Sequence, residues 1–580
     1  MLLELAHYAE RHGISSVPGF ARRRAEWVLH LARDGSFLDV VRESIACDAC
    51  PDLTQPELVG GGGGRSHFLL DSVAVVTGQG DDKERAKHGF FVRLLEEAAH
   101  SAEILKPCAE ALNDAVILQN ISAALSAQHA RPTDPVTFRV DGTLLVQDTS
   151  WHEWWRDFRA TLHSHEGKEK PLMRCLLSGE LVAPAVTHPK VRGLSRVGGQ
   201  ASGSSLIGFD KDSFTSFGLE QSTNAACSEQ SATIYRDALE RLISEAPRPL
   251  AGTLVLHWYK ERLAPEEDLF PGLFGGDESA IDRLAEVKRV IDSIETGRRP
   301  ELLANRYYVL EVSGSGGRVM VRDWFEGSFE SLARSVDLWF DDLNITRPRG
   351  EGLAETPGVY ALYTRLVPRR PRESPRDLFD RIDQQLAPLA PRFWRSILQN
   401  QPLPDDVASR SLAYVRSALL GAGDDDRTPD NLDRVACSLL KAWYNRLCKW
   451  YPKGGRKPVS TNLEPGHPSK AYQAGRMMAV LAEIQRRALG DVGASIIQRY
   501  YAAASATPAL VIGRLVRTAQ FHLGKISKGS VVYFEQLLGE ISRSIGSELP
   551  RTLSLEEQTL FALGYYQQRA ALFEGRHEPK

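Results

Sequence analysis

The chain has 580 residues, of which 42% are hydrophobic and 25% charged, so it can bury several cores and is expected to form roughly two to four domains. No apolar run approaches the length of a membrane-spanning helix, and Glu4, with no basic stretch before it, argues against a signal peptide. Seven scattered cysteines predict a reducing compartment, the cytoplasm. The CxxC pair Cys47 and Cys50 lacks a second pair that would complete a zinc site, so a structural or incidental role is expected.

Charge is distributed very unevenly along the chain. Residues 441–528 contain fifteen Lys and Arg against three acids, a net charge of +12, whereas the whole chain carries −3. Because residues 441–580 sum to +10, residues 1–440 must carry −13. Such an asymmetry indicates a polyanionic partner for the basic part.

Short strands, tight turns and helix patterns alternate in the first 350 residues, which is typical of a mixed α and β fold. The expected elements, in chain order, are a helix at 2–13, a hairpin of 26–31 and 37–41 across Asp34-Gly35, a strand at 68–76, a helix at 85–100, a hairpin of 137–140 and 143–147 across Asp141-Gly142, a strand at 206–209, a helix at 229–244, and strands at 253–258, 307–312 and 319–324.

The chain is predicted to be helical from Pro357 onward. Linkers rich in Pro and Arg occupy 367–375 and 403–405, and a Pro/Gly-rich segment at 452–468 separates the last helices. We therefore predict an α+β fold with three domains: an α/β domain at 1–355 with antiparallel hairpins, a helical connecting region at 356–458, and a C-terminal helix bundle at 459–580.

The segment 441–457 mixes six basic groups with four aromatic ones. Basic groups neutralise phosphates, and aromatic rings can stack on unpaired bases. The candidates for lining the path of a DNA strand are Lys449, Lys453, Arg456 and Lys457. Trp450 is as well suited to the core as to base stacking.

A helix that opens with Thr507 as N-cap and Pro508 is predicted to be amphipathic. Its apolar side contains Ile512, Leu515, Val516, Ala519, Leu523 and Ile526, and its other side carries the basic stripe Arg514, Arg517, Lys525 and Lys528. The stripe, together with Arg476 and Arg487, is predicted to bind phosphates of a DNA strand. The alternative is a solvated helix face.

A polar loop before the helix at 229–244 offers groups suited to base edges. Asn224, Gln221 and Ser216 are the candidate base-reading side chains, with Lys211 on a neighbouring phosphate. Arg65, after a run of five glycines that lacks the spacing of a phosphate-binding P-loop, is a second candidate. The alternative is that Asn224 only closes a turn, with Ser228 as the N-cap of the next helix.

Catalytic motifs are missing from the sequence. No HExxH or GxSxG pattern occurs, and His163 and His165 with Cys175 are a weak resemblance to a metal site. No catalytic residue, metal or cofactor is therefore predicted.

The chain resembles the large subunit of the type I-C CRISPR Cascade complex, the Csd-type family, over nearly its whole length. The residues that carry the resemblance are Val17-Pro18-Gly19-Phe20, Cys175 with Ser178-Gly179 and His188-Pro189, Ser213-Phe214 with Ser216-Phe217-Gly218 and Asn224, Tyr235–Leu242, Leu254–Trp258, Arg318–Trp324, Ala471-Tyr472 with Gly475-Arg476, Ala502–Pro508, and Leu555–Gln567. Leu70-Asp71-Ser72 departs from the family, which tends to have an Asp-Asn pair there.

The resemblance implies a non-enzymatic subunit that recognises the protospacer-adjacent motif in duplex DNA, promotes R-loop formation, holds the displaced strand and recruits the helicase-nuclease. The implied partners are the crRNA, the repeated backbone subunit, the crRNA-handle-processing subunit, a small subunit that can be translated from the same gene, the target duplex, and phage anti-CRISPR proteins. Two other functions stay open on the residues alone: a nuclease with an unrecognised active site, and a purely structural scaffold.

Overall fold

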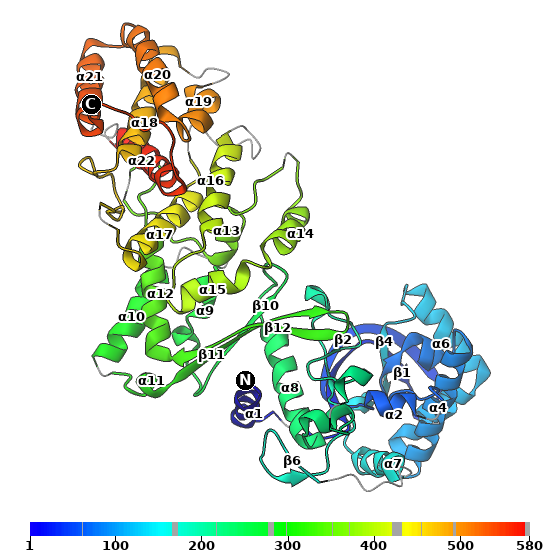
Figure 1. The fold of residues 1–580 in the computed structure, drawn as a ribbon. Helices are drawn as coiled ribbons and strands as arrows, with labels where there is room; N and C mark the ends of the chain where they lie inside the picture. The colour runs from blue at the N-terminus through cyan, green and yellow to red at the C-terminus, as the bar shows by residue number, and fades with distance from the viewer. Residues whose placement is uncertain are drawn as a thin grey trace. The chain divides into compact units, whose positions relative to one another are not determined.

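The computed structural model describes residues 1–14, 16–60, 62–164, 172–215, 217–275, 283–296, 298–350, 352–370, 372–419, 432–453, 455–490 and 495–574. The chain forms two compact units (Figure 1). Unit 1 comprises Met1–Glu245 and Gly314–Met320, and unit 2 comprises Ala246–Ser313 and Val321–Lys580. The boundary near 245 differs from the predicted one near 355, because the strand at 254–259, the strand residues 306–313 and 321–328, and the helix after them pack with the helical half of the chain.

The sheet of unit 1 is built on a long antiparallel hairpin. Strands β1 (Phe20–Leu31) and β2 (Phe37–Pro51) form it, as the Asp-Gly turn predicted. On its other side β1 pairs in parallel with β4 (Pro135–Val140), which pairs with β3 (Asp71–Ser72) and β5 (Thr143–Leu144). The strand order is β2-β1-β4-β3, and the buried side chains of β1 and β4 form the centre of the unit's core.

The remaining elements of unit 1 are helices and short strands around this sheet, and α6 packs on β2 (Figure 1). They are α1 (Leu2–Arg11), α2 (Gln55–Val59), α3 (Val73–Thr77), α4 (Asp82–Ala99), α5 (Lys106–Asn113), α6 (Ala115–Ala127), α7 (His152–Ser164), α8 (Glu229–Glu245), β6 (Met173–Arg174), β7 (Leu181–Val182), β8 (Lys190–Val191) and β9 (Ser204–Ser205).

Most predicted elements of unit 1 are confirmed, including both hairpins and the helices α1, α4 and α8. Ser228 caps α8, since its Oγ accepts from the backbone N–H of Ser231 at 3.0 Å. Two strand predictions are wrong. The apolar run 68–76 ends in helix α3 because Ser72 accepts from the N–H of Val75 and starts a helix there. Residues 206–209 form no strand, and the neighbouring strand is the short β9.

Unit 2 starts with strands and continues with helices, as predicted for the chain beyond Pro357. Its elements are β10 (Leu254–Tyr259), β11 (Arg306–Ser315), β12 (Arg318–Ser328, whose first residues belong to unit 1), α9 (Phe270–Phe274), α10 (Arg283–Glu295), α11 (Glu301–Ala304), α12 (Phe329–Leu343), α13 (Val359–Tyr363), α14 (Pro375–Leu386), α15 (Ala390–Leu398), α16 (Asp405–Leu419), α17 (Arg434–Trp450), α18 (Lys470–Leu489), α19 (Ile496–Ala504), α20 (Pro508–Leu523), α21 (Lys528–Ile545) and α22 (Leu555–Glu574).

One continuous core runs through unit 2, from Leu250 to Leu572. The helices α18 to α22 gather into a bundle around α18 (Figure 1). Since α17 packs on α22 of this bundle, the predicted border at 458/459 does not separate two cores.

A buried carboxyl group in the β10–β11 sheet makes the stability of unit 2 depend on pH. Glu311 has an exposed fraction of 0% and accepts one hydrogen bond, from Thr253 Oγ1 at 2.9 Å. Burial raises the pKa of Glu311 to about 7. The folded state therefore favours the protonated group, whose contribution to stability is present below its ordinary pKa of 4.5 and is lost as the pH rises towards 7.

We expect Glu311→Gln to stabilise unit 2 relative to the wild type by about 2–3 kcal/mol at pH 8 and to change it little at acidic pH, because the amide needs no proton to stay neutral. Thermal unfolding at several pH values measures the difference. Glu326→Gln on the exposed part of β12 is the matched control. Equal shifts at acidic and alkaline pH would contradict the assignment.

Candidate nucleic-acid interface

A cavity of about 1340 Å³ in unit 1 is lined mainly by cations. Among its described lining residues, eleven Lys and Arg face four acids. The basic residues are Arg22, Arg23, Arg24, Arg65, Lys83, Lys87, Lys190, Arg192, Arg196, Arg236 and Arg318, and the acids are Asp52, Asp71, Asp210 and Glu240. With histidines neutral, the lining residues carry a net charge of +7, although the first part of the chain is acidic as a whole. The cavity therefore favours an anionic ligand.

Three consecutive arginines at the start of β1 supply one wall of the cavity. Arg23 donates from Nη1 to the carbonyl oxygen of Leu70 at 2.9 Å, whereas Arg24 is exposed. Burial, followed by repulsion from Arg192, lowers the pKa of Arg23 below its ordinary value. The guanidinium groups of Arg23 and Arg192 therefore repel each other, and a bound anion would reduce this repulsion.

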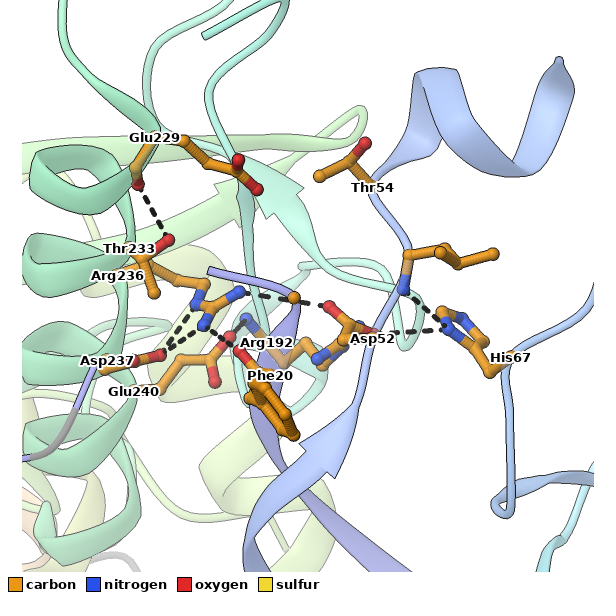
Figure 2. A network of polar contacts seen from close by, with 12 residues as sticks. Phe20, Asp52, Thr54, His67, Arg192, Glu229, Thr233, Arg236, Asp237 and Glu240 are labelled. Atoms are coloured by element: carbon orange, nitrogen blue, oxygen red, sulfur yellow. Dashed lines mark hydrogen bonds and ion pairs between the residues drawn. The ribbon is translucent and has the colours of Figure 1, made fainter. Parts of the chain in front are cut away.

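A buried ionic network, drawn in Figure 2, contributes several of the residues that line the cavity. Asp52 accepts from Arg192 Nη2 at 2.8 Å and lies 3.9 Å from Arg236 Nη1. Arg236 also donates to the carbonyl oxygen of Phe20 and to Asp237, both closer than 3 Å. The backbone N–H of Arg192 donates to Glu240 at 2.8 Å. This network fixes β8 and α8 against the end of β2, and so positions the cations around them.

The protonation states of the network follow from burial and from these neighbours. Burial alone raises the pKa of Asp52, but the guanidinium groups of Arg192, Arg23 and Arg236 lower it well below its ordinary value. Burial, and then Arg23, lowers the pKa of His67 to about 4. His67 is therefore neutral near pH 7, and its Nδ1 accepts from the backbone N–H of Leu53 at 3.3 Å. Its contact with Asp52 is accordingly not an ion pair.

The structure brings two of the five predicted base-reading residues to this cavity. Gln221 and Arg65 both line it, although Arg65 also donates from Nη1 to the carbonyl oxygen of Glu57 at 2.8 Å. Asn224 is not in the lining. Its Nδ2 donates to the carbonyl oxygens of Leu219 and Gln221 at 3.3 and 3.2 Å, which is the turn-closing role weighed as the alternative. Lys211 is exposed on the same loop, and Ser216 lies outside the described residues.

Most of the cavity's cations were missed by the sequence analysis, which treated the first 440 residues as acidic. The run Arg22-Arg23-Arg24 was a visible signal, since three consecutive arginines in a strand put charge on both faces. Lys190, Arg192 and Arg196 were a second visible signal, since they lie within seven residues of a stretch without acids, whereas nothing local marked Arg236 or Arg318.

Much of the basic–aromatic segment 441–457 belongs to the core of unit 2. Lys441, Trp443 and Arg446 are buried in α17, and Lys441 Nζ donates to the carbonyl oxygen of Asp342 at 3.1 Å. Trp450 is 42% exposed and donates from Nε1 to the carbonyl oxygen of Asn400. The alternation of basic and aromatic residues therefore reflects helix packing as far as Cys448, and not a stacking surface.

Two of the predicted phosphate-binding arginines make contacts within unit 2. Arg456 binds Glu556 at the start of α22, with its Nε 2.9 Å from Oε2, and its side chain is 10% exposed. Arg476 is 1% exposed and donates to Gln568, Gln473, Glu540 and the carbonyl oxygen of Pro465. Both guanidinium groups hold segments of unit 2 together, since acceptors from within the protein surround them.

The other predicted cations of unit 2 are accessible to different degrees. Lys449 and Lys453 are exposed. Lys457 forms an ion pair with Glu464, and Arg487 pairs with Glu483 at 2.9 Å while its guanidinium lies over the ring of Phe534. For these four residues, phosphate binding stays a prediction.

The predicted basic stripe is divided between two helices. Helix α20 ends at Leu523, so Arg514 and Arg517 lie on α20, Lys525 lies in the turn, and Lys528 is the first residue of α21. All four are exposed, and the opposite side of α20 packs into the core as predicted. Thr507 precedes α20 but does not cap it, because its Oγ1 donates back to the carbonyl oxygen of Ala503.

The family of this chain was identified by comparing its sequence with models of known protein families. A family described as CRISPR-associated protein (Cas_Csd1) matches residues 4–573. The chain belongs to the Csd1 family of CRISPR-associated proteins. This match confirms the family resemblance inferred from the sequence, over nearly the whole chain.

The comparison with curated proteins gives no match. Among the described residues of this Csd1 protein, no helix is long and apolar enough to cross a membrane. Its seven cysteines are free and buried, including Cys47 and Cys50.

Proposed function

We propose that this Csd1 protein is the non-catalytic large subunit of a cytoplasmic type I-C Cascade complex. In this role it recognises the protospacer-adjacent motif in duplex DNA, promotes R-loop formation, stabilises the displaced strand and recruits the helicase-nuclease. The observation that supports the proposal is the cationic cavity of unit 1 in a chain of a CRISPR-associated family.

The cavity has the chemistry of a site for the phosphate backbone. Phosphate contacts fix the register of a protein on a duplex, and Arg and Lys supply most of them. Arg192 uses Nη2 for Asp52, and its Nη1 has no acceptor among the described residues. Arg24 and Arg196 add exposed charges to the same wall.

Base reading needs neutral polar groups beside these cations, and Gln221 meets this requirement. Its amide both donates and accepts, and its side chain is exposed at the edge of the cavity. Asn224 serves the same loop by holding its turn, so we now assign it to positioning Gln221 and not to reading a base.

The exposed cations of the C-terminal bundle are proposed to hold the displaced strand. We expect the double variant Arg514→Ala and Arg517→Ala to flatten the slope of log K against log salt by about 1.5 for single-stranded DNA. The reason is that binding then neutralises two fewer phosphates and so releases fewer counterions. Salt titrations of the complex on unpaired DNA measure this slope. Arg543→Ala with Arg551→Ala, two other exposed positions of the bundle region, is the matched control, and equal slopes in both double variants would contradict the assignment.

The function itself is tested by purifying the full chain from its host and asking what accompanies it. We expect a crRNA and further Cascade subunits to copurify, and the complex to bind a duplex that carries the crRNA's target with an affinity that falls linearly in log salt. A chain that copurifies with neither RNA nor subunits, or that cleaves DNA alone with a divalent metal, would refute the proposal.

A further inference from the structure

A β-bulge in β2 brings two cysteines of unit 1 onto the same face of the sheet. In the pairing with β1, Cys50 lies opposite Ala21. Cys47 lies opposite Arg23, so two steps along β1 match three steps along β2. In a regular strand, residues three apart point to opposite faces and lie about 10 Å apart. The bulge shortens the separation of the two cysteines to that of two residues, about 6.6 Å, and a disulfide can span Cα atoms up to about 6.8 Å apart.

The bulge is exposed on one face of β2, and both thiols lie on the other face. Asp48, within the bulge, is exposed and pairs with Arg22 at 3.1 Å. Cys47 and Cys50 are buried in the core of unit 1, and the Cys50 thiol donates a hydrogen bond to the sulfur of Cys47. Because β2 is the edge strand of its sheet, these thiols lie at the border of the core, where a molecule the size of hydrogen peroxide has a short path from solvent.

The contact between the thiols makes one of them the better nucleophile. The hydrogen bond from Cys50 outweighs burial and lowers the pKa of Cys47 to about 7. The same hydrogen bond, together with burial, raises the pKa of Cys50. Part of Cys47 is therefore thiolate near neutral pH, and the protonated part donates to the carbonyl oxygen of Val146, 3.2 Å from its sulfur. The thiolate is the form of cysteine that reacts with peroxides.

We propose that Cys47 and Cys50 are a redox-sensitive dithiol that peroxide converts to a disulfide, and that this disulfide weakens the binding of phosphates in the neighbouring cavity. The effect on DNA rests on the proposed function, whereas the disulfide itself does not. Disulfides in the reducing compartment expected for this chain are usually transient and redox-sensing. A Cα separation near the upper limit for a disulfide makes the bond strained and readily reduced, as reversible regulation requires.

The oxidation takes two steps. The Cys47 thiolate attacks one oxygen of hydrogen peroxide, so an S–O bond forms, the O–O bond breaks, and hydroxide leaves and takes up a proton to become water. Cys47 is thereby oxidised to a sulfenic acid, and the peroxide is reduced. The Cys50 sulfur then attacks the Cys47 sulfur, so the S–S bond forms, the S–O bond breaks, and the hydroxyl leaves with the Cys50 proton as a second water. A dithiol reductant reverses the oxidation by thiol–disulfide exchange.

The bulge connects two parts of the cavity wall. Ala46 lines the cavity before the bulge and Asp52 lines it afterwards. Asp52 accepts from Arg192 at 2.8 Å, and Arg23, opposite Cys47, is a further lining residue. An S–S bond of about 2.05 Å is much shorter than a hydrogen-bonded contact between two thiols, so it draws the two sides of the bulge together. Asp52 and the arginine that it holds then move relative to the arginines of β1, and the phosphate site loses its geometry.

Disulfide formation is measured in the assembled crRNA-containing complex, with and without hydrogen peroxide, by alkylating free thiols and digesting with trypsin. Residues 43–65 form one tryptic peptide that contains Cys47 and Cys50 and no other cysteine. We expect this peptide to lose two hydrogens and to escape alkylation after peroxide treatment, and to regain both thiols with dithiothreitol. A reagent for sulfenic acids should label Cys47 in Cys50→Ala but should not label Cys50 in Cys47→Ala. Two thiols that stay fully alkylated after peroxide treatment would overturn the proposal.

The effect on the cavity is measured as the affinity of the same complex for target duplex. We expect oxidation to weaken binding about tenfold, the change for one lost hydrogen bond to a charged group, and dithiothreitol to restore it. The double variant Cys47→Ala and Cys50→Ala should keep the affinity of the reduced wild type in peroxide. The matched control is Cys108→Ala, which removes another buried thiol of unit 1 and should respond to peroxide as the wild type does.

An oxidised wild type that binds duplex as tightly as the reduced one would overturn the effect on the cavity. An equal loss of affinity in the double variant would do the same, because oxidation elsewhere would then be the cause. A reduced complex that binds no duplex would refute the proposed function, while the tryptic peptide would still decide whether the dithiol is oxidised.

Discussion

The triple variant Arg24→Ala, Lys190→Ala and Arg196→Ala is expected to bind target duplex between about tenfold and a hundredfold more weakly than the wild type, with the slope of log K against log salt flatter by about 2.7. These three residues come from β1, β8 and the segment after β8, and all line the cavity of unit 1. Each is accessible, so its loss removes charge without breaking the buried network around Asp52.

Salt-dependent binding of the complex to duplex DNA measures both quantities. The control replaces three exposed cations of unit 1 outside the cavity, Arg33, Arg85 and Lys106, by Ala. Because long-range electrostatics alone would weaken both triple variants equally, only a larger effect of the cavity variant supports a phosphate site. Equal losses would mean that the cavity's position has no special role.

Gly564→Ala is expected to destabilise the C-terminal bundle by at least about 3 kcal/mol, because two helix backbones touch at this residue. A Cβ atom on Gly564 would lie 2.1 Å from the carbonyl oxygen of Tyr472, and one on Gly475 would lie 2.0 Å from that of Phe561. The two glycines thus face each other's helix where α18 crosses α22. Since the obstructing atoms belong to backbones, no side-chain rotation can relieve the clash.

Thermal unfolding, together with hydrogen exchange of the bundle's amides, measures this loss. Gly513→Ala and Gly539→Ala are matched controls, because these glycines lie within α20 and α21 with open space where a Cβ would be placed. Both controls should be stabilised by about 0.5–1 kcal/mol through helix propensity. A Gly564→Ala protein as stable as these controls would contradict the close crossing.

The same crossing bears on a separately translated small subunit. A start at Met477 would remove the first two turns of α18, including Tyr472 and Gly475, which contact α22. A start near Val459 would keep the whole crossing. Mass spectrometry of the purified complex would show which product, if either, is present.

Local patterns were sufficient to predict most of the secondary structure. The hairpin turns, the capped helix α8 and the helical half of the chain follow from interactions between residues close in sequence. The apolar run 68–76 shows the limit of such patterns. A short apolar segment suits a strand or a helix equally, and the hydrogen bond that Ser72 accepts decided for the helix.

The surroundings of individual cations could not be predicted from such patterns, for a different reason. An arginine in a basic sequence segment reaches solvent or a carboxylate depending on where distant residues pack. Arg456 meets Glu556 one hundred residues later, and Arg476 meets Gln568 on α22. Sequence proximity to other basic residues carries no information about either partner.

The sequence by itself determined the family, the mixed fold, the course of most helices and strands, and the expectation of a polyanionic partner, because motif order, periodicity and net charge are properties of the chain. Only the tertiary structure decided where that partner is to be sought in unit 1. It gathers single cations from positions 22 to 318 around Asp52 and places Gln221 at their edge. The physical reason is that a site built from isolated residues of distant segments exists only once the sheet and α8 have packed.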